Sequence, residues 1–394
     1  MDFEVVFNQP IAVSTPIFIP IGPDVDKNLV LVRKMEGSIT KVPIQRFENK
    51  LFFMAEPSVN ISEKPIYSLK SRFDSGLNNG NAYMVQKNGN LQMGIRGKPV
   101  LEYRYGMHYP PSGVDSIFRK SGYIHPLLTP KGDTLTRINP PDHFHHYGIW
   151  GPWTHTRIDT TRVDFWNLGD GQGTVLFKEF VDTTSGPVFS AFSAVQEHID
   201  FKTEKEPQVA LNENLKVTLW NLDQPDRYMF DYTTTFNSPL KNGILFEAYR
   251  YGGGIGMRFN ERWKKDNCTV MTSEGESRID ADGTNARWVI ISGESRTGKG
   301  TNGILFMSHP NNRMHPEPMR IWPEDANGGR GDMFFEFCPI RNVEWPIESN
   351  KDYGLTYRMV VFEGSISAEE AEDYWQGFAN PPEVRTVFNS YRTK

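Results

Sequence analysis

The histidines of this chain are concentrated in one short stretch. Four of the nine fall within thirteen positions, namely His143, His145, His146 and His155. An imidazole changes charge near neutral pH, so it can take up or release a proton under physiological conditions, and its neutral form binds metal ions. The stretch PPDHFHHYGIW, residues 140–150, also ends on Trp150, and Trp153 follows it. The spacing therefore predicts a functional site with proton-transfer or metal-binding chemistry.

If the segment is extended, alternate side chains share a face. His143 and His145 then point one way, about 7 Å apart along the strand, whereas Phe144 and His146 point the other way. Such a pair could bind a divalent metal, or divide into a base and a sugar-binding donor. No nearby pattern of acidic residues selects an ion, so a metal stays an open possibility and no cofactor is required. The alternative is that some of these histidines are structural.

A second candidate stretch is FEAYRYGGGIGMRF, residues 246–259, with Glu247, Arg250 and Arg258 around three consecutive glycines. Glycine allows a ligand to approach the backbone closely, and arginine offers a planar fork that matches a carboxylate or a sulfate. The alternative interpretation is a glycine-rich turn with surface arginines.

Two further stretches combine basic and aromatic side chains. SHPNNRMHPEPMRIWP, residues 308–323, has four prolines that disfavour ladder pairing, so a shaped binding loop is expected there. It contains His309, Asn311, Arg313, His315, Arg320 and Trp322. FRKSGYIHPLLTPKG, residues 118–132, contains Arg119, Lys120, Tyr123 and His125. A cleft that gathers such side chains suits an acidic carbohydrate, because tryptophan packs on sugar C–H faces, arginine binds the acid group, and histidine or tyrosine moves protons.

One apparent nucleotide motif is excluded. GESRTGKG, residues 293–300, nearly matches a phosphate-binding loop, but Gly300 has no hydroxyl for Mg²⁺ and a strand pattern follows in place of a helix. A hairpin turn is predicted.

Strand patterns dominate the elements that must position these residues. Short β-branched and aromatic runs separated by Gly, Pro, Asn and Asp recur along the chain, at 3–7, 15–21, 28–34 and 50–56, and then from residue 82 to 364. Asn88–Gly89 predicts a hairpin. Residues 367–382 predict the one clear helix, with Ser367 as N-cap and Pro381 beyond its end. We expect an all-β fold, a large antiparallel β-sandwich with a C-terminal helix.

Composition narrows the class of protein. In 394 residues the net charge is −5, and no block of like charge indicates a nucleic-acid surface. No apolar run reaches the length that spans a bilayer. The two cysteines have no zinc or disulfide spacing. We expect a small N-terminal β-region at residues 1–70, connected near Ser62–Lys70 to a sandwich domain at 71–394; the sequence leaves the oligomeric state open.

The stretches 121–156, 164–175, 196–198, 249–258 and 309–322 together resemble the PmoA-like family of Bacteroidetes polysaccharide-utilisation proteins. The resemblance runs from about Tyr83 to Pro382, and DHFHHYGIW matches its most specific segment. It implies a mutarotase-like β-sandwich that degrades algal or plant glycans. One family member removes water from the terminal uronic acid of ulvan oligosaccharides, leaving a 4,5-unsaturated product. Export is usual in the family, which implies a periplasmic location after removal of a signal peptide, with a cytoplasmic location as the alternative.

Elimination of water across C4–C5 needs three groups. Arg250, Arg258 or a metal would neutralise the carboxylate, His143 or His145 would take the C5 proton, and His146, His155 or Tyr123 would protonate the departing hydroxyl. Substrate binding is assigned to Arg119, His125, Trp150, Trp153, Glu247, Arg258, His309, Arg313, His315 and Arg320.

Three other functions fit the same residues. A glycoside hydrolase needs two carboxylates about 5–10 Å apart, for which Asp142, Asp164, Glu247 and Asp325 are available. A sugar epimerase or mutarotase would exchange protons between a His and a Glu. A non-catalytic glycan-binding protein would use the same side chains without turnover.

Overall fold

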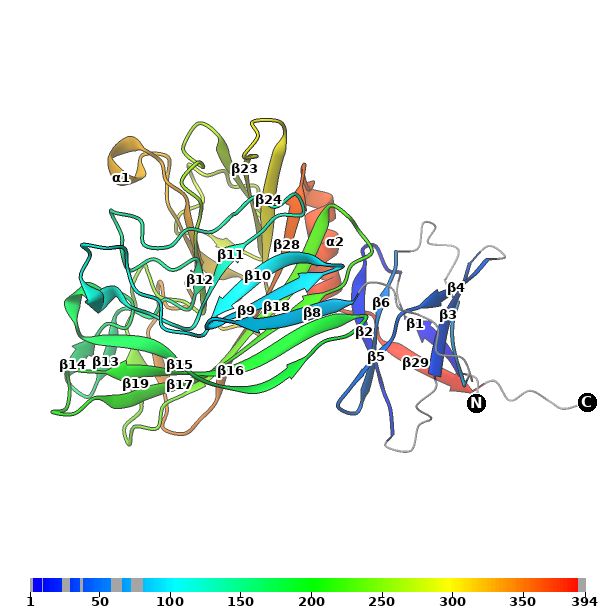
Figure 1. Cartoon of the computed structure of the whole chain (residues 1–394), viewed down its shortest axis with the longest axis horizontal. Helices are drawn as coiled ribbons and strands as arrows, with labels where there is room; N and C mark the ends of the chain where they lie inside the picture. The colour runs from blue at the N-terminus through cyan, green and yellow to red at the C-terminus, as the bar shows by residue number, and fades with distance from the viewer. Residues whose placement is uncertain are drawn as a thin grey trace, which may run out of the picture.

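The structure is a computed structural model that describes residues 3–8, 10–22, 29–35, 38–57, 66–71 and 81–388. Almost all regular structure is β, and the pairs between the named strands are antiparallel throughout the described ranges. The expected all-β fold, a large antiparallel β-sandwich with a C-terminal helix, is confirmed (Figure 1).

One layer of the sandwich is a nine-stranded sheet. Its order is β22 (Asn285–Ala286), β25 (Glu317–Ile321), β26 (Phe334–Phe337), β20 (Ile255–Arg258), β12 (Ile149–Trp150), β11 (Tyr123–Leu127), β10 (Lys98–Arg104), β9 (Asn90–Ile95) and β8 (Ala82–Lys87). The predicted turn at Asn88–Gly89 joins β8 to β9, and both residues have the positive φ that this tight hairpin requires.

The other layer is an eight-stranded sheet of longer strands. Its order is β15 (Gly173–Thr184), β16 (Phe189–Asp200), β17 (Gln208–Trp220), β18 (Arg227–Asn237), β28 (Tyr353–Glu363), β24 (Thr301–Ser308), β23 (Trp288–Glu294) and β21 (Cys268–Thr272). The turn between β23 and β24 is the predicted hairpin at residues 293–300.

The main core lies between these two sheets. Along β18 every second side chain is buried, which is the period-2 pattern of a strand with one covered face. Apolar residues from both sheets form one continuous cluster, exemplified by Leu101, Phe192, Phe230 and Phe335. Burial of this apolar surface is the main driving force that holds the layers together.

A smaller β-region lies beside the sandwich and is built from both ends of the chain (Figure 1). A five-stranded sheet has the order β29 (Val384–Phe388), β1 (Phe3–Phe7), β7 (Ile66–Ser71), β3 (Leu29–Met35) and β4 (Ser38–Val42). A three-stranded sheet has the order β2 (Thr15–Pro20), β6 (Lys50–Ala55) and β5 (Gln45–Phe47). The N-terminal region therefore includes a strand from the end of the chain, because β29 pairs with β1.

The expected connection near Ser62–Lys70 is wrong where the structure describes it. Ile66–Ser71 is strand β7, which pairs with β1 and β3, and residues 58–65 lie outside the described ranges. The β-branched and aromatic character of its first residues favoured a strand.

The predicted C-terminal helix is α2 (Ala368–Ala379). The hydroxyl of Ser367 accepts a hydrogen bond from the backbone N–H of Glu370, as an N-cap should. The helix packs Ala371, Tyr374, Trp375 and Phe378 against the outer face of the eight-stranded sheet. No helix within the described ranges is long and apolar enough to cross a membrane.

A four-stranded sheet and three short helical turns complete the structure. The sheet has the order β14 (Thr161–Val163), β13 (Thr156–Ile158), β19 (Ile244–Phe246) and β27 (Trp345–Ile347). The turns are η1 (Ser116–Phe118), η2 (Leu168–Asp170) and α1 (Ala326–Gly329).

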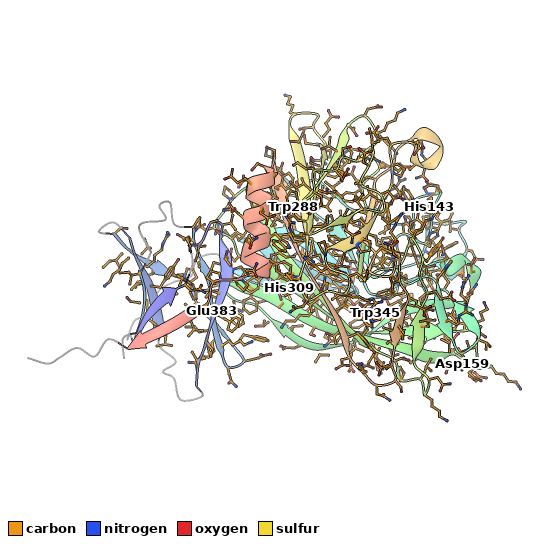
Figure 2. All side chains as sticks on the ribbon, turned by 180° about the vertical axis from the view of Figure 1, so that it is seen from behind. His143, Asp159, Trp288, His309, Trp345 and Glu383 are labelled. Atoms are coloured by element: carbon orange, nitrogen blue, oxygen red, sulfur yellow. The ribbon has the colours of Figure 1, made fainter. Side chains whose placement is uncertain are left out.

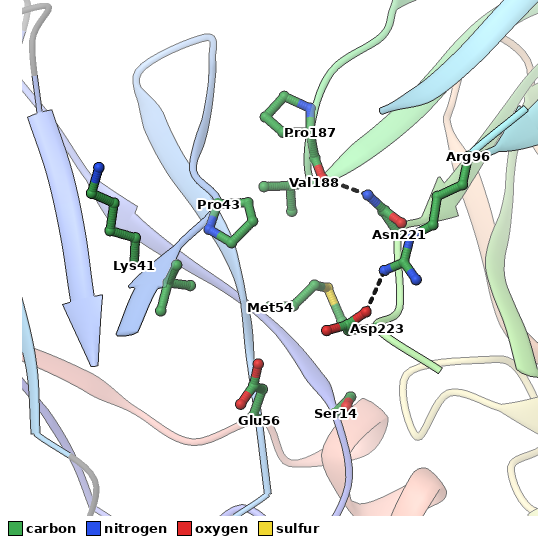
Figure 3. Close-up of a pocket in the computed structure, with 11 residues that line it drawn as sticks. Ser14, Lys41, Pro43, Met54, Glu56, Arg96, Pro187, Val188, Asn221 and Asp223 are labelled. Carbon is green, nitrogen blue, oxygen red and sulfur yellow. Dashed lines mark hydrogen bonds and ion pairs between the residues drawn. The ribbon is translucent and has the colours of Figure 1, made fainter. Parts of the chain in front are cut away.

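A pocket of about 290 Å³ lies where the small β-region meets the sandwich (Figure 3). Lys41 and Glu56 face it from one side, and Arg96 and Asp223 from the other. The ion pair between Arg96 and Asp223 joins two residues of the sandwich. It lies across the pocket from Lys41 and Glu56 of the small β-region.

Candidate active site

The histidine segment is a pair of tight turns, so the extended conformation expected for it is wrong. The N–H of His143 donates to the carbonyl of Pro140, and the N–H of His146 donates to the carbonyl of His143. Consecutive prolines before the segment disfavour a strand. The turns bring all three rings together, with centroids 4.8 Å apart for His143–His146 and His145–His146, and 5.6 Å apart for His143–His145.

The strand order of the nine-stranded sheet places Arg258 beside these rings. Gly148 has a φ of +63°, and a side chain there would collide with the carbonyl of Ile124, so glycine is required where the turns lead into β12. The N–H of Arg258, the last residue of β20, donates to the carbonyl of Gly148 at 2.9 Å. Backbone pairing therefore holds Arg258 opposite Gly148, which follows His146 by two residues in the sequence.

The guanidinium of Arg258 is buried without a hydrogen bond. Its exposed fraction is 1%, and none of its three side-chain nitrogens has a hydrogen-bond partner among the described residues. The closest carboxylates lie beyond hydrogen-bond distance of Nη2, at 3.7 Å for Asp332 and 4.0 Å for Asp142. Burial lowers the pKa of Arg258 to about 10, so it stays charged at neutral pH. Buried donors are normally satisfied, which makes this group a candidate anion-binding site.

Asp332 and Asp142 already have other cationic partners. Asp332 accepts hydrogen bonds from Lys264, Arg330 and Asn327, and Asp142 accepts one from Arg330. Although burial raises the pKa of Asp332, the hydrogen bonds from Lys264 and Arg330 hold it well below its usual range. Both carboxylates therefore have hydrogen-bond partners other than Arg258, while the charge of Arg258 also favours the ionised form of each.

The three imidazoles differ in exposure and in electrostatics. His146 is 1% exposed and its Nδ1 has no partner among the described residues, so the expectation that it is a reachable acid is wrong. Burial lowers the pKa of His145 to about 4. His143 keeps 27% of its side chain exposed, with Nδ1 3.4 Å from Asp142 Oδ2; burial lowers its pKa while Asp142 raises it. His143 is thus neutral, reachable and next to a carboxylate, which suits a general base.

Tryptophans enclose the cluster. The ring of Trp322 lies 5.0 Å from that of His143, and the guanidinium of Arg258 lies 4.6 Å from the Trp322 ring. Trp166 stacks on His146 at 5.6 Å, and Trp150 packs against His146 at 5.5 Å. Trp150 is only 3% exposed, so it forms a buried wall of the cluster, and the substrate-binding role expected for it is wrong. Low-dielectric walls strengthen the electrostatic interactions inside such a site.

Tyr251 links Arg320 to the cluster. Its hydroxyl accepts hydrogen bonds from Arg320 Nη2 and from Trp322 Nε1, both at 3.0 Å. Arg320 also forms an ion pair with Asp282 at 2.6 Å. Arg250 is exposed, with its guanidinium 5.4 Å from the Tyr251 ring, so it lies at the rim and not inside.

Several predicted site residues belong to the protein core or to structural ion pairs. Trp153 is 1% exposed and stacks on Phe246 at 4.1 Å in the main core, so its expected sugar-binding role is wrong. Glu247 accepts hydrogen bonds from Arg157 and Arg162, so it forms structural ion pairs with these two arginines and not the substrate contact expected for it. His155 stacks on Tyr249 at 3.6 Å beside this pair, outside the imidazole cluster.

The residues 119–125 also lie apart from the imidazoles. Tyr123 is 1% exposed and its ring packs on Tyr147, and burial raises its pKa, so it is not placed to protonate a substrate. His125 hydrogen-bonds to Thr136 at 2.8 Å, and Arg119 is exposed at the end of η1.

The stretch 308–323 divides between two places. His309 packs on Phe378, His315 stacks on Trp375, and Arg313 lies over Trp345, so none of these three contacts the cluster. Figure 2 shows His143 and His309 at different parts of the molecule. The expected irregular loop is also corrected, because Glu317–Ile321 is strand β25 and pairs with β26; this pairing carries Arg320 and Trp322 to the site.

No group of three or more His, Cys, Asp or Glu side chains in the described ranges is arranged to hold a metal ion. The rings of the His cluster instead pack on one another and on tryptophan faces. Among the described residues of the cluster, Arg258 is the cation whose side-chain nitrogens have no hydrogen-bond partner, so it is the group that could bind an anion.

Sequence reasoning did not select four residues of this site: Trp166, Tyr251, Arg330 and Asp332. Two of them had a usable signal, because Trp166 and Tyr251 stand inside the stretches 164–175 and 246–259 that were singled out. Arg330 and Asp332 come from a loop after α1, and no local pattern marks them.

Comparison with solved structures gives three distant similarities. The heparan sulfate lyase HepC from Pedobacter heparinus has a TM-score of 0.33 at 9% identity, over 73% of this chain and 36% of its own. The GH36 α-galactosidase AgaA from Geobacillus stearothermophilus has 0.31 at 7%, over 72% and 41%. A galactose mutarotase related enzyme from Lactobacillus acidophilus has 0.31 at 10%, over 72% and 97%. TM-scores this low carry no inference about activity.

No curated protein sequence matches the chain. A family model does match it, over residues 90–376, which include every residue of the imidazole cluster and exclude every strand of the small β-region. Because this match covers more than half of the 394 residues, the chain belongs to the family of unknown function DUF6807.

Proposed function

We propose that this protein is a carbohydrate-active lyase: a dehydratase that eliminates water across C4–C5 of a non-reducing-end uronic acid on ulvan-type oligosaccharides. The observation that carries the proposal is the buried guanidinium of Arg258 next to the imidazole of His143. Among the described residues this guanidinium has no hydrogen-bond partner, and its ion pairs with Asp332 and Asp142 are long, at 3.7 and 4.0 Å. The resemblance of DHFHHYGIW and its neighbouring stretches to the PmoA-like family supports the choice of substrate, and with it a periplasmic location.

Arg258 would bind the C6 carboxylate of the uronic acid, which requires the side chains that cover its guanidinium to move apart when the substrate enters. A carboxylate supplies acceptors for the vacant guanidinium donors in a bidentate geometry, which satisfies both groups. Neutralising the carboxylate also matters for reactivity, because a full negative charge beside C5 makes its proton hard to remove. The buried location of Arg258 strengthens this effect relative to a surface arginine.

His143 would remove the C5 proton. Its imidazole is neutral at pH 7 because burial lowers its pKa, so it can accept a proton. Asp142 lies 3.4 Å from Nδ1 and would stabilise the imidazolium that forms. The electron pair of the C5–H bond then forms the C4=C5 double bond, and the 4-hydroxyl leaves as water after it gains a proton. A positioned base contributes about 10²–10⁴-fold to such a step.

Glycoside hydrolysis is the weaker alternative. Asp142 and Asp332 form a carboxylate pair at the cluster, joined through Arg330. Both have a pKa below the usual range, despite burial that opposes this, because arginine and lysine partners hold the charged forms. A hydrolase needs one carboxylic acid that stays protonated at working pH.

The test is incubation with oligosaccharides that end in glucuronic acid on sulfated rhamnose. Ultraviolet absorbance of the conjugated unsaturated uronate and loss of one water in the mass spectrum are expected with the unmodified protein. His143→Gln should remove both signals. His309→Gln, a histidine outside the cluster, is the control and should keep them. Release of a free sugar without a new double bond would refute elimination and favour the hydrolase.

A further inference from the structure

We infer that Tyr251 is the catalytic acid that protonates the departing 4-hydroxyl, a role that rests on the proposed dehydratase function. Elimination requires an acid as well as a base, since hydroxide is a poor leaving group. Of the groups expected for this part, His146 and Tyr123 are walled in by neighbouring rings, and His155 lies against Tyr249. Tyr251 is partly exposed and belongs to the aromatic wall of the imidazole cluster.

The hydrogen bonds of Tyr251 leave its own proton unused. Its oxygen accepts two hydrogen bonds at 3.0 Å, from Arg320 Nη2 and Trp322 Nε1. A phenol oxygen has two acceptor positions and one proton. Within the described residues the Tyr251 hydroxyl donates to no acceptor, so its proton is available to a ligand.

The same two donors would stabilise the phenolate that remains after proton transfer. Arg320 places its guanidinium 4.8 Å from the Tyr251 ring as well as donating to the oxygen, and Asp282 holds Arg320 in place through an ion pair. Hydrogen bonds aimed at developing negative charge are the usual source of such stabilisation. Arg320 therefore acts as a positioning residue through Tyr251.

Trp322 joins the three groups that the reaction needs. Its indole N–H contacts the Tyr251 oxygen, its ring lies 5.0 Å from His143, and the guanidinium of Arg258 lies 4.6 Å from that ring. In the substrate, the carboxylate, the C5 proton and the 4-hydroxyl are carried on three consecutive carbons. All three groups border the same indole, and we assign Arg258 to the carboxylate, His143 to the C5 proton and Tyr251 to the hydroxyl.

The step balances. The C5–H bond breaks and its proton goes to His143; the C4=C5 bond forms; the C4–O bond breaks, and the oxygen leaves as water with the proton of Tyr251. The Tyr251 phenolate and the protonated His143 are restored by exchange of one proton with solvent. No oxidant or reductant is needed.

A fluoride leaving group separates the acid from the rest of the site. In a 4-deoxy-4-fluoro-glucuronide substrate, His143 still takes the C5 proton, but fluoride departs as an anion and needs no proton. We expect Tyr251→Phe to slow water elimination by about 10²–10⁴-fold, while fluoride release falls by less than about tenfold because base and carboxylate binding are intact. His143→Gln should stop both reactions.

Tyr249→Phe is the matched control, because Tyr249 lies two residues away along the chain and its ring stacks on His155, outside the imidazole cluster. It should change neither reaction. Trp322→Phe, which removes one donor to the Tyr251 oxygen, should also slow water elimination more than fluoride release. Circular dichroism and thermal melting of each variant check that it is folded.

Equal losses of water and fluoride elimination in both Tyr251→Phe and Trp322→Phe would overturn the assignment, as would full retention of water elimination. If the unmodified protein released neither water nor fluoride, the proposed function itself would fail.

Discussion

Replacing Arg258 with methionine should stabilise the fold and abolish activity at the same time. A residue kept for structure does the opposite, because its loss weakens the fold. The prediction follows from the burial of the Arg258 guanidinium at 1% exposure without a hydrogen bond among the described residues. Methionine has a similar length and apolar character, so it can occupy the same space.

The magnitude follows from the pKa of Arg258, which burial lowers from 12.5 to about 10 although Asp332 and Asp142 act in the opposite direction. A pKa difference of one corresponds to about 1.4 kcal/mol, so the charged side chain costs the native state about 3 kcal/mol. Methionine forfeits the cation–π contact with Trp322, worth about 0.5–2 kcal/mol. The net gain in unfolding free energy should be about 1–2 kcal/mol. Neither carboxylate becomes unpaired, because Arg330 contacts both.

Differential scanning calorimetry measures the stability, and a rise of about 1–4 °C in melting temperature is expected. The catalytic efficiency kcat/KM on the uronyl substrate should fall by about 10²–10³-fold, as for loss of one partner of a buried charge pair. Free glucuronate should raise the melting temperature of the unmodified protein but not of Arg258→Met.

Arg313→Met is the matched control, since Arg313 also lies over a tryptophan ring but donates to the Glu344 carbonyl. It should give no gain in stability and no loss of activity. If Arg258→Met instead destabilised the fold by about 3–5 kcal/mol, Arg258 would be one half of a buried structural ion pair. The argument for an anion site would then be refuted.

Three further outcomes can be checked on the same protein. The double change His143→Gln with Asp142→Asn should reduce turnover no further than His143→Gln alone, because Asp142 acts through that imidazole; additive losses in kcat would contradict this. Trp153→Ala should lower the unfolding free energy by about 3–5 kcal/mol, because it leaves a cavity in the core. Urea titration measures this free energy, and a loss under about 1 kcal/mol would show that Trp153 does not lie in the core. Burial lowers the pKa of His125 and of His145 to about 4, so the native state binds fewer protons than the unfolded chain. Stability should therefore fall as the pH drops from about 6.5 towards 4, and His145→Gln should flatten that fall in melting temperature; an unchanged slope would count against a buried neutral His145.

Local patterns in the sequence were sufficient for much of the fold. The Asn88–Gly89 hairpin and the helix begun at Ser367 depend on residues within a few positions of each other, and both are present. The closeness of the three imidazoles at 143–146 also follows from the chain itself. The directions in which the three rings point could not be predicted in the same way. Side chains alternate between two faces only in an extended chain, and this segment makes two turns.

Long-range pairing decided which residues join those imidazoles. Trp150 and Trp153 are equivalent in the sequence, yet Trp150, in β12, packs on His146, whereas Trp153, beyond the end of that strand, lies in the core. Tyr123 and Tyr251 are likewise equal candidates by type, and only the tertiary structure distinguishes them: it buries Tyr123 and places Trp322 beside a partly exposed Tyr251.

The sequence by itself determined the all-β class, the C-terminal helix and the presence of an imidazole cluster next to tryptophan, since each of these depends on side chains close together along the chain. Only the tertiary structure decided that Arg258 is the buried cation, that Glu247 is tied to other arginines, and that Asp332 and Tyr251 complete the site. The physical reason is the sheet order β25–β26–β20–β12, which brings residues 320–322, 332–334 and 258 beside 143–146. Hydrogen bonds between strands far apart in the sequence set that order, and no local propensity encodes it.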